Sequence, residues 1–141
     1  QAKRMNLPMM VEHNTSVYGT AFTISIDAAK GVTTGVSAPD RVKAIKAVIN
    51  PNGNPEDLAS PGHMFPLVAK KGGVLERDGH TEASVDLARL AGFAPAGILC
   101  ELCAPDGLMA KLPRVTTFAM EHDLTCLSIE DLIAYRKEKN I

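Results

Sequence analysis

The pattern of hydrophobic and polar residues changes its period along this 141-residue chain. Residues 19–27, GTAFTISID, alternate with a period of two, which is typical of a half-buried strand. One face of this strand would carry the apolar residues Phe22, Ile24 and Ile26. The opposite face would carry the polar residues Thr23, Ser25 and Asp27. We therefore expect an early strand in a sheet that is antiparallel or mixed.

A helical period begins after Ser37, which is placed like an N-cap with Asp40 three residues later. Pro39 suits the first turn of such a helix, and Pro51 would stop it. The apolar stripe between these limits consists of Val42, Ile45, Val48 and Ile49. This stretch predicts an amphipathic helix.

Further helical patterns cover residues 81–91, 114–123 and 128–140. Gly92 is a natural residue to follow the first of these helices, because glycine tolerates the left-handed conformation found there. Ser128 and Asp131 are spaced like a capping box at the start of the last helix. All three helices lie in the second half of the chain.

Short apolar runs predict strands within residues 67–76, 96–102 and 124–129, whereas residues 50–66 have the Pro, Gly and Asn content of a long loop. Strands and helices would then alternate through the second half of the chain. This alternation predicts an α/β fold with a mixed β-sheet, and the length suits one domain over residues 1–141.

Charge and cysteine content narrow the class of protein. Fifteen basic and sixteen acidic residues give a net charge of -1, so no basic surface is expected to bind nucleic acid. No apolar run is long enough to cross a bilayer, and we expect no signal peptide and no membrane partner. Three cysteines form no evident disulfide framework, which predicts a reducing, cytoplasmic setting.

The densest polar cluster is the run Arg77, Asp78, Gly79, His80, Thr81 and Glu82. One interpretation is a polar turn in which Thr81 or Asp78 caps the following helix. The other is an anion site, because a helix start presents unpaired N–H groups and Arg77 can add a forked charge. His80 would be available there as a metal ligand or an acid/base. Both interpretations agree with the local pattern.

Two further residues are candidates for catalysis. Glu101 lies in the apolar run 96–102, so it is either a buried, working carboxylate or a residue at a strand end that already reaches solvent. His63 lies between prolines in SPGHMFP, where a loop could present it to a site or simply expose it. The pattern alone does not choose between these alternatives.

The cysteines allow a competing hypothesis. A zinc-binding interaction module can be written from Cys100, Cys103, His122 and Cys126. Cys100 and Cys126 fall in apolar runs, however, where cysteine more often packs as a small hydrophobic residue.

Several segments, in order, resemble 3,4-dihydroxy-2-butanone 4-phosphate synthase, a lyase family of riboflavin biosynthesis. They are NTSVYGTAFTISIDAAKGVTTGVSAPDR, PGHMFPL, GGVLERDGHTEASVDLARLAGFAPAGILCEL, DGLMA and SIEDLIAYR. The resemblance runs from about Leu7 to Arg136. It implies an α/β sandwich around a mixed sheet, a homodimer with active sites near the subunit interface, and conversion of ribulose 5-phosphate to 3,4-dihydroxy-2-butanone 4-phosphate and formate. The implied cofactor is Mg²⁺ or Mn²⁺, with no organic cofactor.

The resemblance also implies roles for residues. His80 would be a metal ligand, and His63 and Glu101 would be the catalytically required histidine and glutamate. The substrate, chiefly its phosphate, would be bound by Arg77, Asp78, Gly79, His80, Thr81 and Glu101. Tyr18 and Thr34 stand in family motifs near the site. Enolising a ketose phosphate needs a base and a cation, and we expect Glu101 to move protons during that chemistry.

One family segment is not matched by any part of the chain. The family's acidic loop, of the form D-x-E-D-R-E-x-E, supplies the other protein metal ligand, and no such run occurs between Gln1 and Ile141. We therefore expect the chain to correspond to the C-terminal two-thirds of such a domain, without a fused cyclohydrolase domain. On this basis residues 1–141 alone would bind Mg²⁺ weakly and would not turn over ribulose 5-phosphate. A truncated, non-catalytic, dimerising chain is the alternative.

Overall fold

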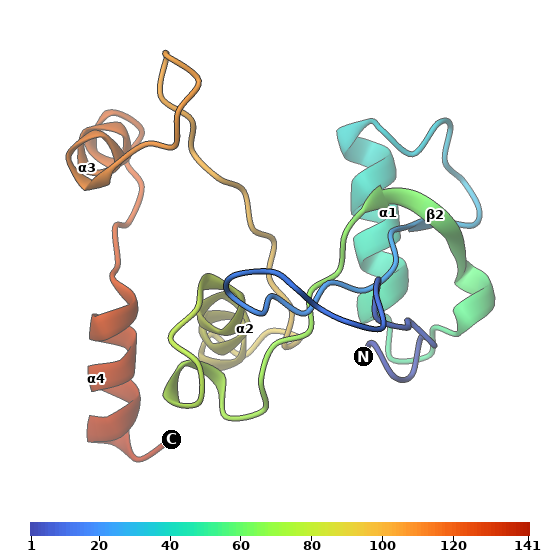
Figure 1. The fold of residues 1–141 in the computed structure, drawn as a ribbon, viewed down its shortest axis with the longest axis horizontal. Coiled ribbons are helices and arrows are strands. Elements are labelled where there is room, and N and C mark those ends of the chain that lie inside the picture. Colours follow the sequence, from blue (N-terminus) through green and yellow to red (C-terminus); the bar gives the residue numbers. More distant parts are fainter. The chain divides into compact units, whose positions relative to one another are not determined.

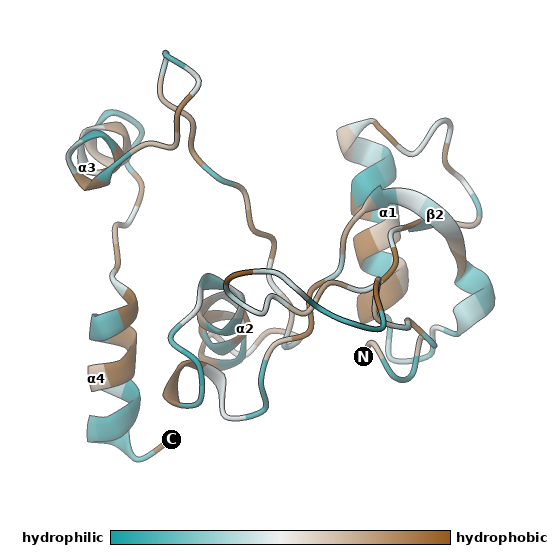
Figure 2. Cartoon of the chain, in the orientation of Figure 1, coloured by the Kyte–Doolittle hydropathy of each residue, from teal (hydrophilic) through white to brown (hydrophobic).

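The computed structural model describes residues 1–141, which form two compact units. The first unit comprises Gln1–Ala69 and the second comprises Lys70–Ile141. Figure 1 shows the helices and strands of both units, and Figure 2 shows that the helices carry hydrophilic and hydrophobic residues together. No helix has the length and the apolar character that crossing a membrane requires.

The first unit is built on a strand pair and one helix. Strand β1 (Ile26–Ala28) pairs antiparallel with β2 (Leu58–Met64), and helix α1 (Ala38–Ile49) packs against both. The short 3₁₀ helix η1 (Pro55–Asp57) leads into β2. The side chains of Met5, Ile26, Ala28 and Ala44 are buried and form the apolar interior of this unit.

The pairing of β1 with β2 is irregular at the position that matters for the site. Asp27 pairs with Ala59, but its neighbour Ile26 pairs with Met64, so the register shifts between them. Gly62 lies against the backbone of Ile26 so closely that a Cβ atom there would collide with it. Residues 60–63 therefore bend out of the regular ladder, which brings His63 beside Asp27.

Several expectations for the first unit need correction. The strand expected over residues 19–27 is regular only from Ile26, and Thr23 is buried whereas Phe22 is 40% exposed. Thr23 tolerates burial because its hydroxyl hydrogen is shared between the carbonyls of Ile24 and Pro66, which both lie within hydrogen-bond distance. The loop expected over residues 50–66 contains β2. Pro61 is compatible with β2, because β2 pairs with one other strand only. In addition, the register of the pairing breaks between Ala59 and Met64, on either side of Pro61.

The expected helix after Ser37 is confirmed. The Ser37 side chain accepts a hydrogen bond from the backbone N–H of Asp40, Pro39 lies in the first turn, and the helix ends at Ile49, two residues before Pro51. The local capping signal therefore located this helix correctly.

The second unit is helical. It contains the 3₁₀ helix η2 (Gly73–Leu75) and the helices α2 (His80–Leu90), α3 (Leu112–Glu121) and α4 (Ile129–Lys139). Val74 of η2, Ala83 of α2 and Leu132 of α4 form its buried apolar cluster. All three expected helices are confirmed, as are the capping box of Ser128 with Asp131 and the left-handed Gly92.

The strands expected in the second unit are wrong. Residues 73–75 form a 3₁₀ turn, residues 96–102 and 124–128 are irregular, and Ile129 begins α4. The nearest approach to strand pairing in this unit is the isolated bridge between Cys103 and Met109. An apolar run becomes a strand only when a neighbouring strand accepts its hydrogen bonds, and no such neighbour is present here.

Candidate active site

His63 is held at three of its atoms. Its Nδ1 lies 2.8 Å from Oδ2 of Asp27, and its backbone N–H donates to Oδ1 of the same carboxylate at 3.0 Å. Nη1 of Arg41 donates to the His63 carbonyl at 2.9 Å. A carboxylate can only accept, so Nδ1 carries the hydrogen in the neutral ring and Nε2 carries the lone pair. The Nε2 lone pair of His63 is thereby directed away from Asp27.

The surroundings of Asp27 keep it ionised. The hydrogen bond from the His63 backbone is the main cause that lowers the pKa of Asp27 below its ordinary value of 3.8, and desolvation acts in the opposite direction. Nearby positive charge on Arg41 lowers the pKa further. Asp27 therefore remains an acceptor for His63 throughout the neutral range.

A tight loop covers the Asp27 carboxylate. Gly35 has a φ of 83° and lies over Asp27 so closely that a Cβ atom there would collide with the carboxylate. The buried carboxylate of Asp40 fixes this loop by accepting hydrogen bonds from the Thr33 hydroxyl at 2.7 Å and from the Gly35 N–H at 3.3 Å. Only glycine suits position 35, because the backbone there is left-handed and the Asp27 carboxylate leaves no room for a Cβ atom. Thr34, expected near the site, belongs to the same loop.

The polar run at residues 77–82 forms the start of α2. The N-cap residue is Gly79, and no side chain caps the helix with a hydrogen bond. The interpretation in which Thr81 or Asp78 caps the helix is therefore wrong. Arg77 instead makes an ion pair with Glu82, whose Oε2 lies 2.6 Å from Nη1 and whose side chain is 2% exposed. A Cβ atom on Gly79 would collide with this pair, which explains the glycine.

Glu82 also ties the chain before the helix to α2. Its second carboxylate oxygen accepts the backbone N–H of Lys70 at 2.9 Å. One turn later, the buried Asp86 accepts the N–H of Val74 and pairs with Arg136 of α4. These two carboxylates hold residues 70–77 against the helix that carries His80 and Thr81.

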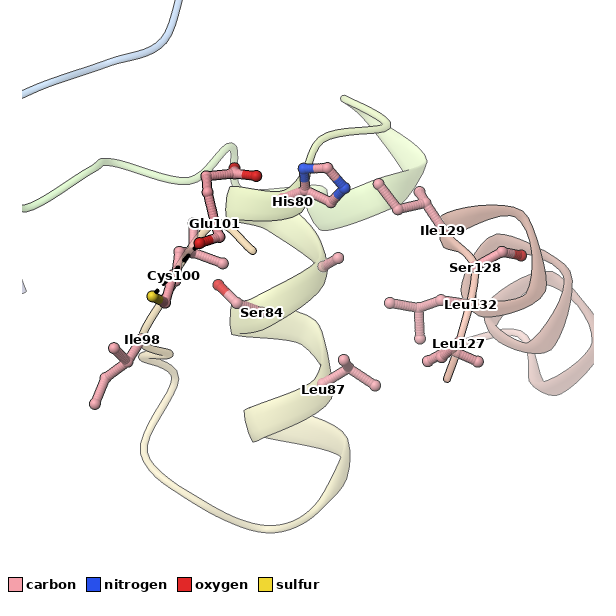
Figure 3. A pocket seen from close by; sticks show the side chains of 12 residues that line it. His80, Ser84, Leu87, Ile98, Cys100, Glu101, Leu127, Ser128, Ile129 and Leu132 are labelled. Carbon is pink, nitrogen blue, oxygen red and sulfur yellow. Dashed lines mark hydrogen bonds between the residues drawn. The ribbon is translucent and has the colours of Figure 1, made fainter. Parts of the chain in front are cut away.

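His80 and Glu101 line one pocket of about 370 Å³ in the second unit. Figure 3 shows both at the N-terminal end of α2, with Glu101 contributed by the irregular segment that follows the helix. The remaining lining includes Ser84, Leu87, Cys100 and Leu132. Glu101 is exposed, so the interpretation as a buried strand carboxylate is wrong, because the strand that would have buried it is absent. His80 and Glu101, 21 positions apart in the sequence, are nevertheless brought together.

The cysteines do not form the zinc site considered above. All three are free and exposed, and no three His, Cys, Asp or Glu side chains form a group that could hold a metal ion. His80 likewise belongs to no such group of three side chains.

Sequence reasoning missed three residues that hold candidate residues of the two units in place. Asp27 was assigned only to the polar face of a strand, although it orients His63, which is 36 positions away. Glu82 and Arg41 received no role. An acid in the first helical turn five positions after an arginine was a usable signal for Glu82. No local signal could reveal Asp27 or Arg41, since their partners lie far along the chain.

The fold and the sequence together define the class of protein. A model of the 3,4-dihydroxy-2-butanone 4-phosphate synthase family matches residues 1–135. The chain belongs to this family, which confirms the resemblance seen in its motifs.

Individual relatives agree with this assignment. The 3,4-dihydroxy-2-butanone 4-phosphate synthase of Nitratidesulfovibrio vulgaris strain Hildenborough is 61% identical over 141 residues, which are 100% of this chain and 66% of the relative. The protein of the same name from Klebsiella pneumoniae subsp. pneumoniae is 59% identical over 96% of this chain and 63% of its own length. The chain therefore spans just under two thirds of the length of these curated relatives.

Solved structures show the same fold. A two-domain 3,4-dihydroxy-2-butanone 4-phosphate synthase from A. baumannii matches with a TM-score of 0.90 and 45% identity, over 96% of this chain and 40% of that one. Another synthase, in complex with two magnesium ions, matches with a TM-score of 0.87 and 38% identity, over 99% of this chain and 70% of that one. The expected α/β class is confirmed by this likeness.

Proposed function

We propose that this chain carries catalytic and substrate-binding residues of a 3,4-dihydroxy-2-butanone 4-phosphate synthase. This lyase converts ribulose 5-phosphate to 3,4-dihydroxy-2-butanone 4-phosphate and formate in riboflavin biosynthesis. Membership of the family supports the proposal. The observation that carries it is the pocket that unites His80 and Glu101 at the start of α2.

In this proposal His63 and Glu101 exchange protons with the substrate. His63 accepts a proton at Nε2, while Asp27 holds Nδ1–H and stabilises the imidazolium that forms. Glu101 is exposed to the pocket and can accept and return protons during the rearrangement that ends in formate. Two groups with different surroundings suit a reaction with several proton transfers.

The substrate would be bound at the start of α2. Arg77 contributes positive charge that Glu82 fixes in place, and Asp78 and Gly79 bring the backbone close to the ligand. The first N–H groups of α2, at His80 and Thr81, have no side-chain cap and suit a phosphate. These assignments remain our proposal for the substrate site.

A divalent cation, Mg²⁺ or Mn²⁺, fits this site in part. A solved relative holds two magnesium ions. His80 would supply one imidazole nitrogen, and magnesium commonly keeps waters and substrate oxygens as its other ligands. When bound, such a cation would stabilise an enediolate. We propose no organic cofactor.

We also propose a cytoplasmic homodimer. Large apolar side chains stand exposed in the second unit, among them Phe93 at 73%, Leu112 at 72% and Met120 at 77%. A second copy that covers them would remove this apolar area from water. Ribulose 5-phosphate is the small-molecule partner, and no nucleic acid or membrane partner is proposed.

Glu101→Gln tests the catalytic proposal, with Glu121→Gln as the matched control. Glu121 is an exposed glutamate at the end of α3, outside the pocket. Measured on protein that also carries the family's acidic loop, formate release from ribulose 5-phosphate should fall about 10²- to 10⁴-fold in Glu101→Gln, since general acid–base catalysis contributes that much. Glu121→Gln should match the unchanged protein. Full turnover by Glu101→Gln would refute the role of Glu101.

The alternative of a non-catalytic, dimerising chain predicts a different result. In that case the protein would release no formate even with the family's acidic loop present, while it still self-associates. Sedimentation measured beside the formate assay separates the two functions.

A further inference from the structure

Arg41 joins two segments that surround the Asp27–His63 pair. It lies in the first turn of α1. Its Nε donates to the Val36 carbonyl at 2.8 Å, and its Nη1 donates to the His63 carbonyl at 2.9 Å. The guanidinium therefore connects the covering loop to strand β2 at the histidine itself.

Each of these contacts constrains one side of the pair. The bond to His63 fixes the peptide from which the imidazole projects. The bond to Val36 holds the residue next to Gly35, which covers the Asp27 carboxylate. Asp27 in turn accepts both the ring Nδ1–H and the backbone N–H of His63. Arg41 thus holds the acceptor and the base in one arrangement without touching the imidazole.

We propose that Arg41 is a positioning residue that holds His63 in its Nδ1-protonated form with Nε2 directed away from Asp27. The inference rests on the proposed function, in which His63 is the base. A lysine cannot replace this arginine, because one ammonium lacks the planar fork that reaches two carbonyls from fixed positions. The positive charge near Asp27 adds to this role by favouring the carboxylate form.

Arg41→Lys and Arg41→Gln test the proposal, with Lys46→Gln as the control. Lys46 lies on the same helix, is exposed, and loses the same charge in the control variant. The first measurement is nitrogen-15 NMR of the imidazole rings, with His63 assigned by a His63→Gln variant among the four histidines. We expect one Nδ1-protonated His63 in the unchanged protein and in Lys46→Gln, and a tautomer mixture in both Arg41 variants.

The second measurement is the kinetics of formate release. We expect kcat to fall about 10- to 100-fold in both Arg41 variants, because small displacements of a catalytic group cost that much. KM should stay within about 2-fold, since Arg41 is not proposed to touch substrate. An unchanged His63 spectrum in folded Arg41→Lys would overturn the inference. If protein that also carries the family's acidic loop releases no formate, the proposed function fails, and the NMR comparison still decides the role of Arg41.

Discussion

The ion pair between Asp86 and Arg136 links two helices of the second unit. Oδ2 of Asp86 lies 2.7 Å from Nη1 of Arg136, and the two side chains are 1% and 12% exposed. The same oxygen accepts the Val74 N–H at 2.9 Å, and Nη1 of Arg136 also donates to the Gly72 carbonyl at 2.8 Å. Asp86 therefore joins α2 both to α4 and to the turn before Arg77.

Asp86→Asn removes the charge and keeps the size of the side chain. Removing one partner of a buried pair costs about 3–5 kcal/mol, because the other charge stays desolvated. The amide oxygen of asparagine can still accept the Val74 N–H, so we expect the lower end, about 3 kcal/mol. Arg89 also approaches Asp86, but at 3.7 Å and with 52% exposure. Arg89→Gln should cost at most about 1 kcal/mol.

Urea unfolding followed by circular dichroism measures both variants, and hydrogen exchange locates the effect. A loss of about 3 kcal/mol corresponds to roughly 100-fold faster exchange of the most protected amides in α2 and α4. The double variant Asp86→Asn with Arg136→Met should recover most of the loss, since no charge is left buried and asparagine still accepts the Val74 N–H. The reasoning is refuted if Asp86→Asn stays within about 1 kcal/mol of the unchanged protein, or if Arg89→Gln is equally damaging.

Two further predictions follow from the glycine and the carboxylate that shape the site. Gly79→Ala would push a methyl group into the Arg77–Glu82 pair. We expect the free energy of unfolding in urea to fall by about 1–3 kcal/mol and the KM for ribulose 5-phosphate to rise. An unchanged KM would contradict this prediction. The Thr33 hydroxyl is the main cause that holds the pKa of Asp40 below its ordinary value of 3.8. The ionised Asp40 therefore stabilises the fold above about pH 3.8, and this stabilisation is lost as the pH falls through the lowered pKa. Unfolding free energies measured between about pH 6 and pH 3 should therefore fall less steeply in Asp40→Asn than in the unchanged protein, and equal slopes would disprove the assignment.

Features that depend on neighbouring residues were readable from the sequence. Helix α1 was predicted from Ser37 and Asp40, and α4 from Ser128 and Asp131, because a cap and its helix lie within one turn. The amphipathic period likewise located α2 and α3. The family motifs identified His80 and Glu101 as candidates, and the pocket brings these two together.

Features that depend on distant residues were not readable in the same way. The expected strand over 96–102 lacks a neighbour to accept its hydrogen bonds, so Glu101 is exposed rather than buried. Conversely, residues 58–64 look like a loop, yet they form β2 because β1 lies beside them. A strand is a property of a pair of segments, which no single segment can specify.

By itself, the sequence determined the helices, their caps and the residue types available for chemistry, because these follow from periodicity and from contacts within one turn. The tertiary structure alone decided which partners the carboxylates have. Asp27 orients His63, Glu82 fixes Arg77, and Asp86 joins two helices, in pairs between 5 and 50 positions apart. A buried carboxylate is stable only with a partner, and folding determines where that partner lies.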